Sequence, residues 1–165
     1  MNQNLSYLSF LLALTVFFTS CKKDADPESF FSFEGKKYTV VHAVSSGYEG
    51  VRIATFSTSE DMHPDFGTIH YISIRFKLPS LQPGTYTFKP SASPDFDPST
   101  NFFGASASLN CEFFYSELRE QNVTSLTDVT GGTVTVSRDG QNYTFEYDLD
   151  FNGRQLNGVY VGTIK

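Results

Sequence analysis

The chain has 165 residues, a formal net charge of −6 at pH 7 and a pI near 4.9. An acidic balance without clustered Lys and Arg argues against a nucleic-acid partner. The same charge provides no electrostatic attraction to anionic lipid, so any association with a membrane must come from a different feature of the chain.

An almost wholly apolar run, Leu8 to Phe18, stands near the start of the chain. A membrane-spanning helix needs about 20 apolar residues, and this run has about half that number before the polar segment Lys22–Asp24 ends it. Such a length is typical of the apolar part of an export signal, with small residues before the cleavage point. The sequence therefore predicts a signal peptide over residues 1–20.

The tetrapeptide Phe18-Thr19-Ser20-Cys21 ends the predicted signal. It resembles the lipobox of bacterial lipoproteins, in which signal peptidase cuts before a cysteine that becomes lipid-modified. The resemblance implies that Cys21 carries a diacylglycerol and an N-acyl chain, and two lipid signals of this kind give durable membrane anchoring. An ordinary secretory signal with a coincidental cysteine, or a short membrane anchor, are the alternatives.

A polar segment, KKDADPES, follows Cys21 and lacks any apolar period. We therefore assign residues 21–29 to the lipidated cysteine and a flexible tether, and residues 30–165 to a single domain. The acidic residues of the segment after Cys21 resemble a surface-export signal of Bacteroidetes lipoproteins, although a solvated linker has the same composition. We expect a protein anchored by lipid in the cell outer membrane, and we favour the cell surface over the periplasmic side.

From Phe30 onward the pattern is that of β-structure. Apolar and polar residues alternate over 69–78 and 102–114, which predicts half-buried strands. The segments Ser57–Thr68 and Lys89–Asn101 are predicted loops, the second because three prolines interrupt it. Residues 115–121 are the single helix candidate.

The clearest structural signal lies in the last third of the chain. Alternating runs are separated by a turn at residues 138–141 and by Asn152-Gly153, and Asn-Gly between such runs is the strongest short-range signal for a hairpin. This predicts a three-stranded meander. The whole domain is predicted to be all-β, an antiparallel β-sandwich or a partly closed barrel that ends in this meander.

Four turn-and-strand motifs span the mature chain: FSFEGK (residues 31–36), LQPGTYTF, GTVTVSRDG and GVYVGTIK. Their order resembles that of small Bacteroidetes outer-membrane lipoproteins of uncharacterised function. The resemblance implies a location in the cell envelope and supplies no catalytic residues.

Cys111 is the one cysteine besides Cys21. Alternation places it on the same side of its strand as Leu109 and Phe113, which predicts a buried structural thiol. A nucleophilic thiol would need a neighbouring His or cationic group to lower its pKa.

Two groups of charged residues are candidates for metal binding or catalysis. Asp61, His63 and Asp65 lie in one predicted loop, but a metal site needs three or four converging ligands. Carboxylates at 146, 148 and 150 alternate along one strand, as expected for a solvent-facing surface. Because no catalytic motif accompanies them, we expect neither an enzyme nor a bound metal or cofactor.

Aromatic side chains in or beside loops are the candidates for ligand binding: Tyr48, Phe66, Phe96 and Phe102. An exposed ring can stack on a sugar or anchor a protein partner. We expect a non-catalytic lipoprotein whose β-domain binds or scaffolds an unknown protein or glycan partner. The alternative is a carbohydrate-binding accessory protein of a glycan-uptake system.

Overall fold

The computed structural model describes residues 28–165. The predicted signal peptide, Cys21 and most of the predicted tether lie outside the described residues. The last two residues of that tether are bonded to the domain. Glu28 pairs with Lys37 at 2.6 Å, and the Ser29 hydroxyl accepts a hydrogen bond from the Val161 N–H at 2.9 Å. Across residues 28–165, no helix is long and apolar enough to span a membrane.

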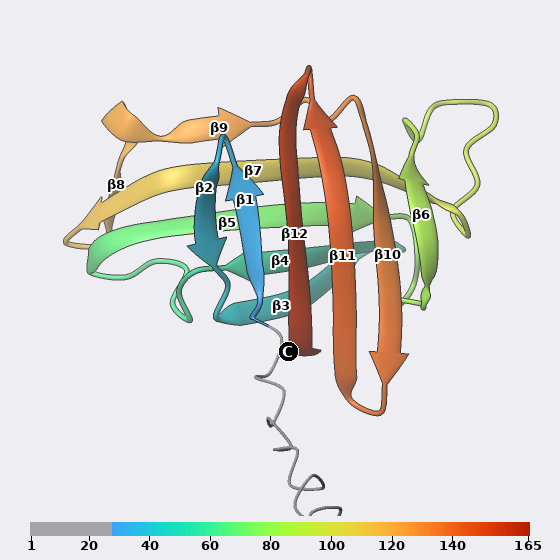
Figure 1. The fold of residues 1–165 in the computed structure, drawn as a ribbon, viewed down its shortest axis with the longest axis horizontal. Coiled ribbons are helices and arrows are strands. Elements are labelled where there is room, and N and C mark those ends of the chain that lie inside the picture. Colours follow the sequence, from blue (N-terminus) through green and yellow to red (C-terminus); the bar gives the residue numbers. More distant parts are fainter. Residues whose placement is uncertain (1–27) are drawn as a thin grey trace, which may run out of the picture.

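The described residues form one curled, open β-sheet, so the predicted all-β fold is confirmed (Figure 1). The front layer holds six strands in the order β2 (Lys36–Thr39), β1 (Phe30–Phe33), β12 (Arg154–Thr163), β11 (Asn142–Phe151), β10 (Gly131–Asp139) and β6 (Gly84–Phe88). The back layer continues with β7 (Asn101–Phe114), β5 (Phe66–Phe76), β4 (Val51–Ser57) and β3 (His42–Tyr48). Two short strands, β8 (Glu117–Arg119) and β9 (Thr124–Leu126), also pair with β7.

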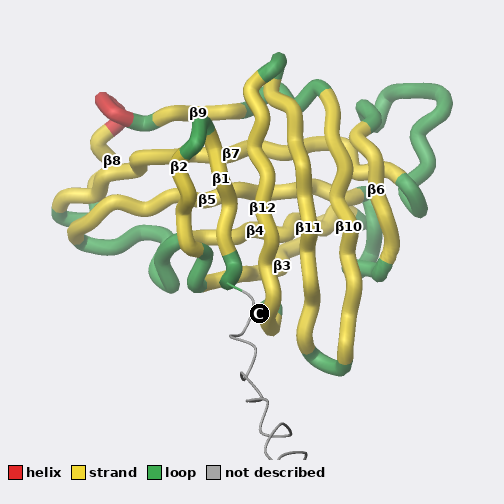
Figure 2. Tube along the Cα trace, viewed as in Figure 1, coloured by secondary structure: helices red, strands yellow, loops and turns green. Residues whose placement is uncertain are grey.

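The strands of the front layer run across those of the back layer, and the sheet curls into a half-barrel (Figure 1). Neighbouring strands pair antiparallel except at the corner, where β6 pairs antiparallel with β10 and parallel with β7. At the opposite corner, the backbone of Lys165 donates to the Ala43 carbonyl and accepts from the Ser45 N–H. Figure 2 shows that loops are confined to the ends of the strands.

The main core lies between the two layers. Phe56 of β4 meets three rings of the front layer, with centroid distances of 5.1 Å to Phe145, 5.6 Å to Tyr147 and 5.3 Å to Tyr160. Side chains at alternate positions of β5 and β11 point into this core, as the alternation predicts. Burial of these large apolar groups is the main source of the domain's stability.

The predicted three-stranded meander is confirmed as β10, β11 and β12. Asn152 and Gly153 have φ values of 56° and 84°, the positive values that a two-residue type I′ hairpin turn requires. Their place between β11 and β12 sets the register in which Leu149 and Leu156 pair on the core side.

A β-bulge interrupts β7, where Leu109 and Asn110 together lie opposite His70 of β5. Asn110 has a φ of 58°, so the side chains that follow it point to the opposite face of the sheet from the one that alternation would give. Leu109 belongs to the main core, whereas Cys111 and Phe113 pack with Ile69 in a second cluster. Cys111 is therefore buried as predicted, but the prediction that it shares a side with Leu109 is wrong because simple alternation does not allow for a bulge.

The helix predicted over residues 115–121 is wrong. Tyr115 and Ser116 form a turn, β8 follows as a strand, and Glu120–Asn122 make a single 3₁₀ turn (Figure 2). Pairing of β8 with the end of β7 satisfies backbone groups of this segment in the sheet.

Candidate functional site

The strongest candidate surface is a group of exposed side chains where β5, β7 and β8 extend past β2 (Figure 1). We call it the aromatic end and define it as Phe66, Phe114, Tyr115 and Arg119. Phe66 and Phe114 are paired across β5 and β7, and Tyr115 follows in the turn to β8. Phe66 is 55% exposed and Tyr115 69% exposed. Solvent-exposed apolar residues gathered in this way, rather than scattered singly, indicate an interaction site.

Three rings of the aromatic end support one another. The centroid of Phe66 lies 5.4 Å from that of Phe114 and 4.8 Å from that of Tyr115, and the centroids of Phe114 and Tyr115 are 4.6 Å apart. All three contacts are edge-to-face, the arrangement that the quadrupole of an aromatic ring favours. Each ring therefore has a defined position although much of its surface is exposed.

Arg119 contributes a positive charge to the aromatic end. Its guanidinium lies 4.4 Å from the centroid of the Phe114 ring, at cation–π distance. In the strand register, Arg119 of β8 lies opposite Glu112 of β7. The aromatic end thus combines aromatic rings and an arginine, the types enriched in protein interfaces.

The turn that carries Tyr115 has an unusual composition. Tyr115 and Ser116 have φ values of 54° and 62°, a conformation that such two-residue turns usually achieve with Asn and Gly. The Ser116 N–H donates to the Asp65 carbonyl at 3.1 Å, and its hydroxyl donates to the Asp65 carboxylate. A bulky residue in this conformation is strained, and strain of this kind is concentrated at functional sites.

A hollow of about 350 Å³ lies on the other face of the same strands. Its walls include Met62, His63, Tyr71, Cys111, Phe113 and Leu118. Leu118 lies opposite Phe113 in the register and faces this hollow rather than the aromatic end. Burial raises the pKa of the Cys111 thiol, which keeps it in its neutral, unreactive form.

The four aromatic residues selected from the sequence lie in four different places. Phe66 belongs to the aromatic end, whereas Tyr48, 77% exposed, stands at the turn between β3 and β4. Phe96 is half-buried in the loop between β6 and β7. The selection of Phe102 as an exposed residue is wrong, because its ring is 0% exposed and packs between Phe76 and Phe88 in the core.

The charged residues of the loop before β5 serve to shape it. The Asp61 carboxylate accepts the His63 N–H at 2.9 Å, and the Asp65 carboxylate accepts the Ser116 hydroxyl. Within residues 28–165, no three His, Cys, Asp or Glu side chains lie together in a way that could hold a metal ion.

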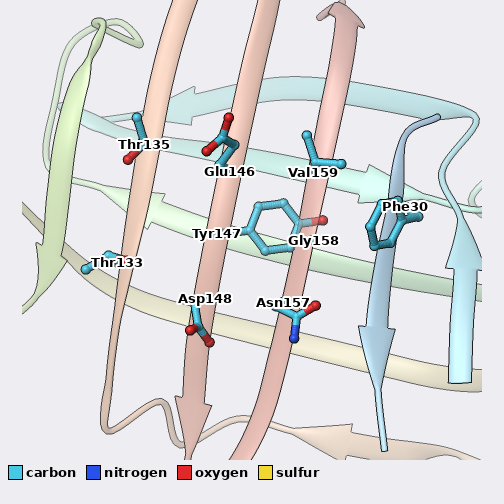
Figure 3. A pocket seen from close by; sticks show the side chains of 9 residues that line it. All are labelled: Phe30, Thr133, Thr135, Glu146, Tyr147, Asp148, Asn157, Gly158 and Val159. Carbon is cyan, nitrogen blue, oxygen red and sulfur yellow. The ribbon is translucent and has the colours of Figure 1, made fainter. Parts of the chain in front are cut away.

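A second candidate surface is a groove across the outer face of the front layer, shown in Figure 3. The strand register places its side chains in two rows that cross the strands. One row consists of Thr135, Glu146, Val159 and Phe30, and the other of Thr133, Asp148 and Asn157. The volume of this groove is about 470 Å³. It displays hydroxyl, carboxylate and amide groups to solvent.

The floor of this groove is a close contact between two strands. Gly158 of β12 pairs with Tyr147 of β11, whose ring lies on the core side. The Tyr147 hydroxyl is buried without a hydrogen-bond partner, and burial raises the pKa of this phenol. Glu146 and Asp148, the neighbours of Tyr147 in β11, project outward to solvent, which is the arrangement that the sequence predicts.

Comparison of the chain with protein-family models, with curated proteins and with solved structures finds no match.

Proposed function

We propose that this protein is a lipid-anchored, non-catalytic binding protein of the bacterial outer membrane, and that it contacts a protein partner through the aromatic end. The sequence around Cys21 supports the location. The observation that carries the binding role is the turn at Tyr115 and Ser116, which presents an exposed ring from a strained backbone. The hairpin between β7 and β8 needs this backbone conformation, but Asn and Gly would adopt it with less strain. The choice of a bulky, exposed residue at this position is best explained by a function of its side chain.

The arrangement of the rings favours a protein partner. Phe66, Phe114 and Tyr115 pack edge-to-face against one another, so they form a raised cluster rather than one flat platform for a sugar ring. A cluster of this kind, with Arg119 beside it, has the composition of an interface hot spot. The chemistry of the cluster favours binding over catalysis because its side chains offer contact area and a fixed cation.

Two variants test the lipid anchor. Cys21→Ser removes the proposed lipidation site, so metabolic labelling with a fatty acid and recovery in the membrane fraction should both be lost. Cys111→Ser is the matched control, because this thiol is buried and should leave labelling unchanged. Fatty-acid labelling that persists in Cys21→Ser would reject the anchor.

Co-purification from solubilised membranes tests the binding surface. Tyr115→Ser and Phe66→Ser should each reduce recovery of a partner by about tenfold or more, the usual effect of truncating a hot-spot residue. Tyr48→Ser, at the turn between β3 and β4, should leave recovery unchanged. Equal recovery with all three variants would reject the aromatic end as the binding surface.

The groove in Figure 3 favours carbohydrate binding as a second candidate function. Its threonine hydroxyls, carboxylates and Asn157 amide are suited to the hydroxyl groups of a glycan, and Phe30 offers a ring at one end. A glycan array probed with the full chain separates the two functions. A signal that Asn157→Ala abolishes and Tyr115→Ser leaves intact would favour the carbohydrate function, and no signal would favour the protein partner.

A further inference from the structure

His70 occupies the centre of the bulge that sets the position of the aromatic end. Its Nδ1 atom accepts a hydrogen bond from the Asn110 N–H at 2.9 Å. Asn110 is the bulged residue with a φ of 58°, and its N–H faces His70 rather than a backbone carbonyl of β5. The imidazole thus replaces a backbone acceptor at one of the two points where the pairing of β5 and β7 is interrupted.

The residues that follow the bulge depend on this hydrogen bond. The chain turns over at Asn110, which sends Cys111 and Phe113 to the second cluster and places Phe114 on the side of Phe66. Loss of the acceptor would leave the Asn110 N–H unpaired in a part-buried position, and an unpaired buried donor favours opening of the local structure. Residues 111–114 are the first that such an opening would reach.

The groups around His70 come from three elements. From β2, the Tyr38 ring lies 4.5 Å from the imidazole, and Lys36 acts on it electrostatically. From the loop before β5, the Thr58 hydroxyl accepts a hydrogen bond from the backbone N–H of His70, and the backbone N–H of Thr58 donates to the His70 carbonyl. From β7 come Asn110 and, opposite Thr68, the carboxylate Glu112. Burial first, and the charge of Lys36 second, lower the pKa of His70.

We propose that His70 is an acid-sensitive switch, whose protonation at Nδ1 breaks the hydrogen bond to Asn110 and loosens the segment that carries the aromatic end. The proton comes from solvent and converts the accepting nitrogen into an N–H donor, so two donors then face each other. The new positive charge also repels Lys36. The consequence for partner binding rests on the proposed function, whereas the structural switch does not.

Exposure of the Cys111 thiol tests the switch directly. This side chain follows the bulged residue and is 2% exposed. The protein used is the full chain with Cys21→Ser, in detergent, so that Cys111 is the sole cysteine. The rate of reaction of Cys111 with 4,4′-dithiodipyridine is measured in the folded and in the unfolded chain at the same pH. Protection is the rate in the unfolded chain divided by the rate in the folded chain. We expect protection to fall about tenfold between about pH 7.5 and about pH 5, as expected for loss of one hydrogen bond to a buried group.

Substitutions of His70 separate the imidazole from other titrating groups. His70→Asn puts a neutral amide oxygen close to the position of Nδ1, so Cys111 should stay protected at both pH values. His70→Phe retains a ring against Tyr38 but has no acceptor, so protection should be low at both. If His70→Asn retains the full pH dependence, or if the parent protein shows none, the switch is rejected.

Two neighbouring lysines provide a second test that leaves His70 in place. Lys36→Gln removes the charge that opposes protonation, so the midpoint of the exposure should move to higher pH. Lys37→Gln is the matched control, because Lys37 pairs with Glu28 and does not act on His70. An equal shift in both variants would contradict the assignment. Thiol exposure needs no partner, so a normal switch together with a failed co-purification rejects only the proposed function.

Discussion

The ring of Tyr147 lies where a side chain of Gly158 would stand. A Cβ atom built on Gly158 would lie 2.7 Å from two atoms of this ring and 2.5 Å from the Phe30 carbonyl oxygen. The glycine lets β11 and β12 pair closely while the ring reaches across its partner strand and stacks on Phe56 in the core. This contact forms the floor of the groove in Figure 3.

Gly158→Ala should lower the free energy of unfolding by about 2 kcal/mol, since the added methyl group must displace either the Tyr147 ring or the β1 backbone. Urea denaturation measures this difference. Gly131→Ala is the matched control: the nearest atom to its Cβ would be 3.7 Å away, an ordinary contact, so the change should be within about 0.5 kcal/mol. Equal effects at both positions would contradict the close contact.

Tyr147→Phe should raise the free energy of unfolding by about 1 kcal/mol, because it removes a buried hydroxyl that has no partner. Tyr86→Phe should lower it by about the same amount, because the Tyr86 hydroxyl donates to the Gln82 carbonyl at 2.8 Å. Thermal and urea unfolding of the two variants compare these changes. A loss of stability in both would mean that the Tyr147 hydroxyl has a partner.

Tyr115→Asn should raise the free energy of unfolding by roughly 1 kcal/mol while it weakens partner binding, because asparagine tolerates the left-handed conformation. The reverse change at the equivalent turn position, Asn152→Tyr, should lower stability by a similar amount. Chemical denaturation gives the stability and co-purification gives the binding. A Tyr115→Asn variant that is both less stable and fully active would contradict the role assigned to this turn.

The free energy of unfolding should fall as the pH is lowered through about 6.5, the usual pKa of a histidine in an unfolded chain. The pKa of His70 is lower in the native state, so between the two values the unfolded chain binds more protons and acid favours unfolding. The stability is fully present above about pH 6.5. His70→Asn should remove this dependence in urea titrations at a series of pH values above about 5.

Carboxylates affect the stability of the domain at lower pH than His70 does. The hydrogen bond from Lys37 lowers the pKa of Glu28, and the hydrogen bonds from Ser99 lower that of Asp97. Their contributions are therefore lost only as the pH falls below the usual value for a carboxylate, near about 4. A change in stability between about pH 7.5 and about pH 5 that His70→Asn leaves in place would contradict the role of His70.

Alternation and turn composition predicted most of the fold. The meander was predictable because Asn152-Gly153 has the residues that its turn requires and because β11 alternates along its whole length. The turn at Tyr115 and Ser116 was not, because neither residue indicates positive φ. Charged residues of the next segment instead suggested a helix, and pairing with β7 overrides that local preference.

The candidate site was predictable only in part for the same reason. Its place beside a predicted loop identifies Phe66 as a candidate, but its partners Phe114 and Tyr115 adjoin a turn that the sequence does not indicate. The bulge at Asn110 likewise has no strong sequence signal, so the reversal of Cys111 relative to Leu109 could not be read from alternation. Phe102 stands at the start of a strand, and only the packing of both layers shows that it is enclosed.

The most direct test of the proposed function is site-specific photo-crosslinking in intact cells. A benzoylphenylalanine residue is placed at position 115 or, as control, at position 48. Tyr48 is the more exposed of the two side chains, at 77% against 69%, so random collisions would favour it. We predict one discrete crosslinked species from position 115 and none from position 48. Equal crosslinking at both positions, or none at position 115, would contradict a binding role for the aromatic end.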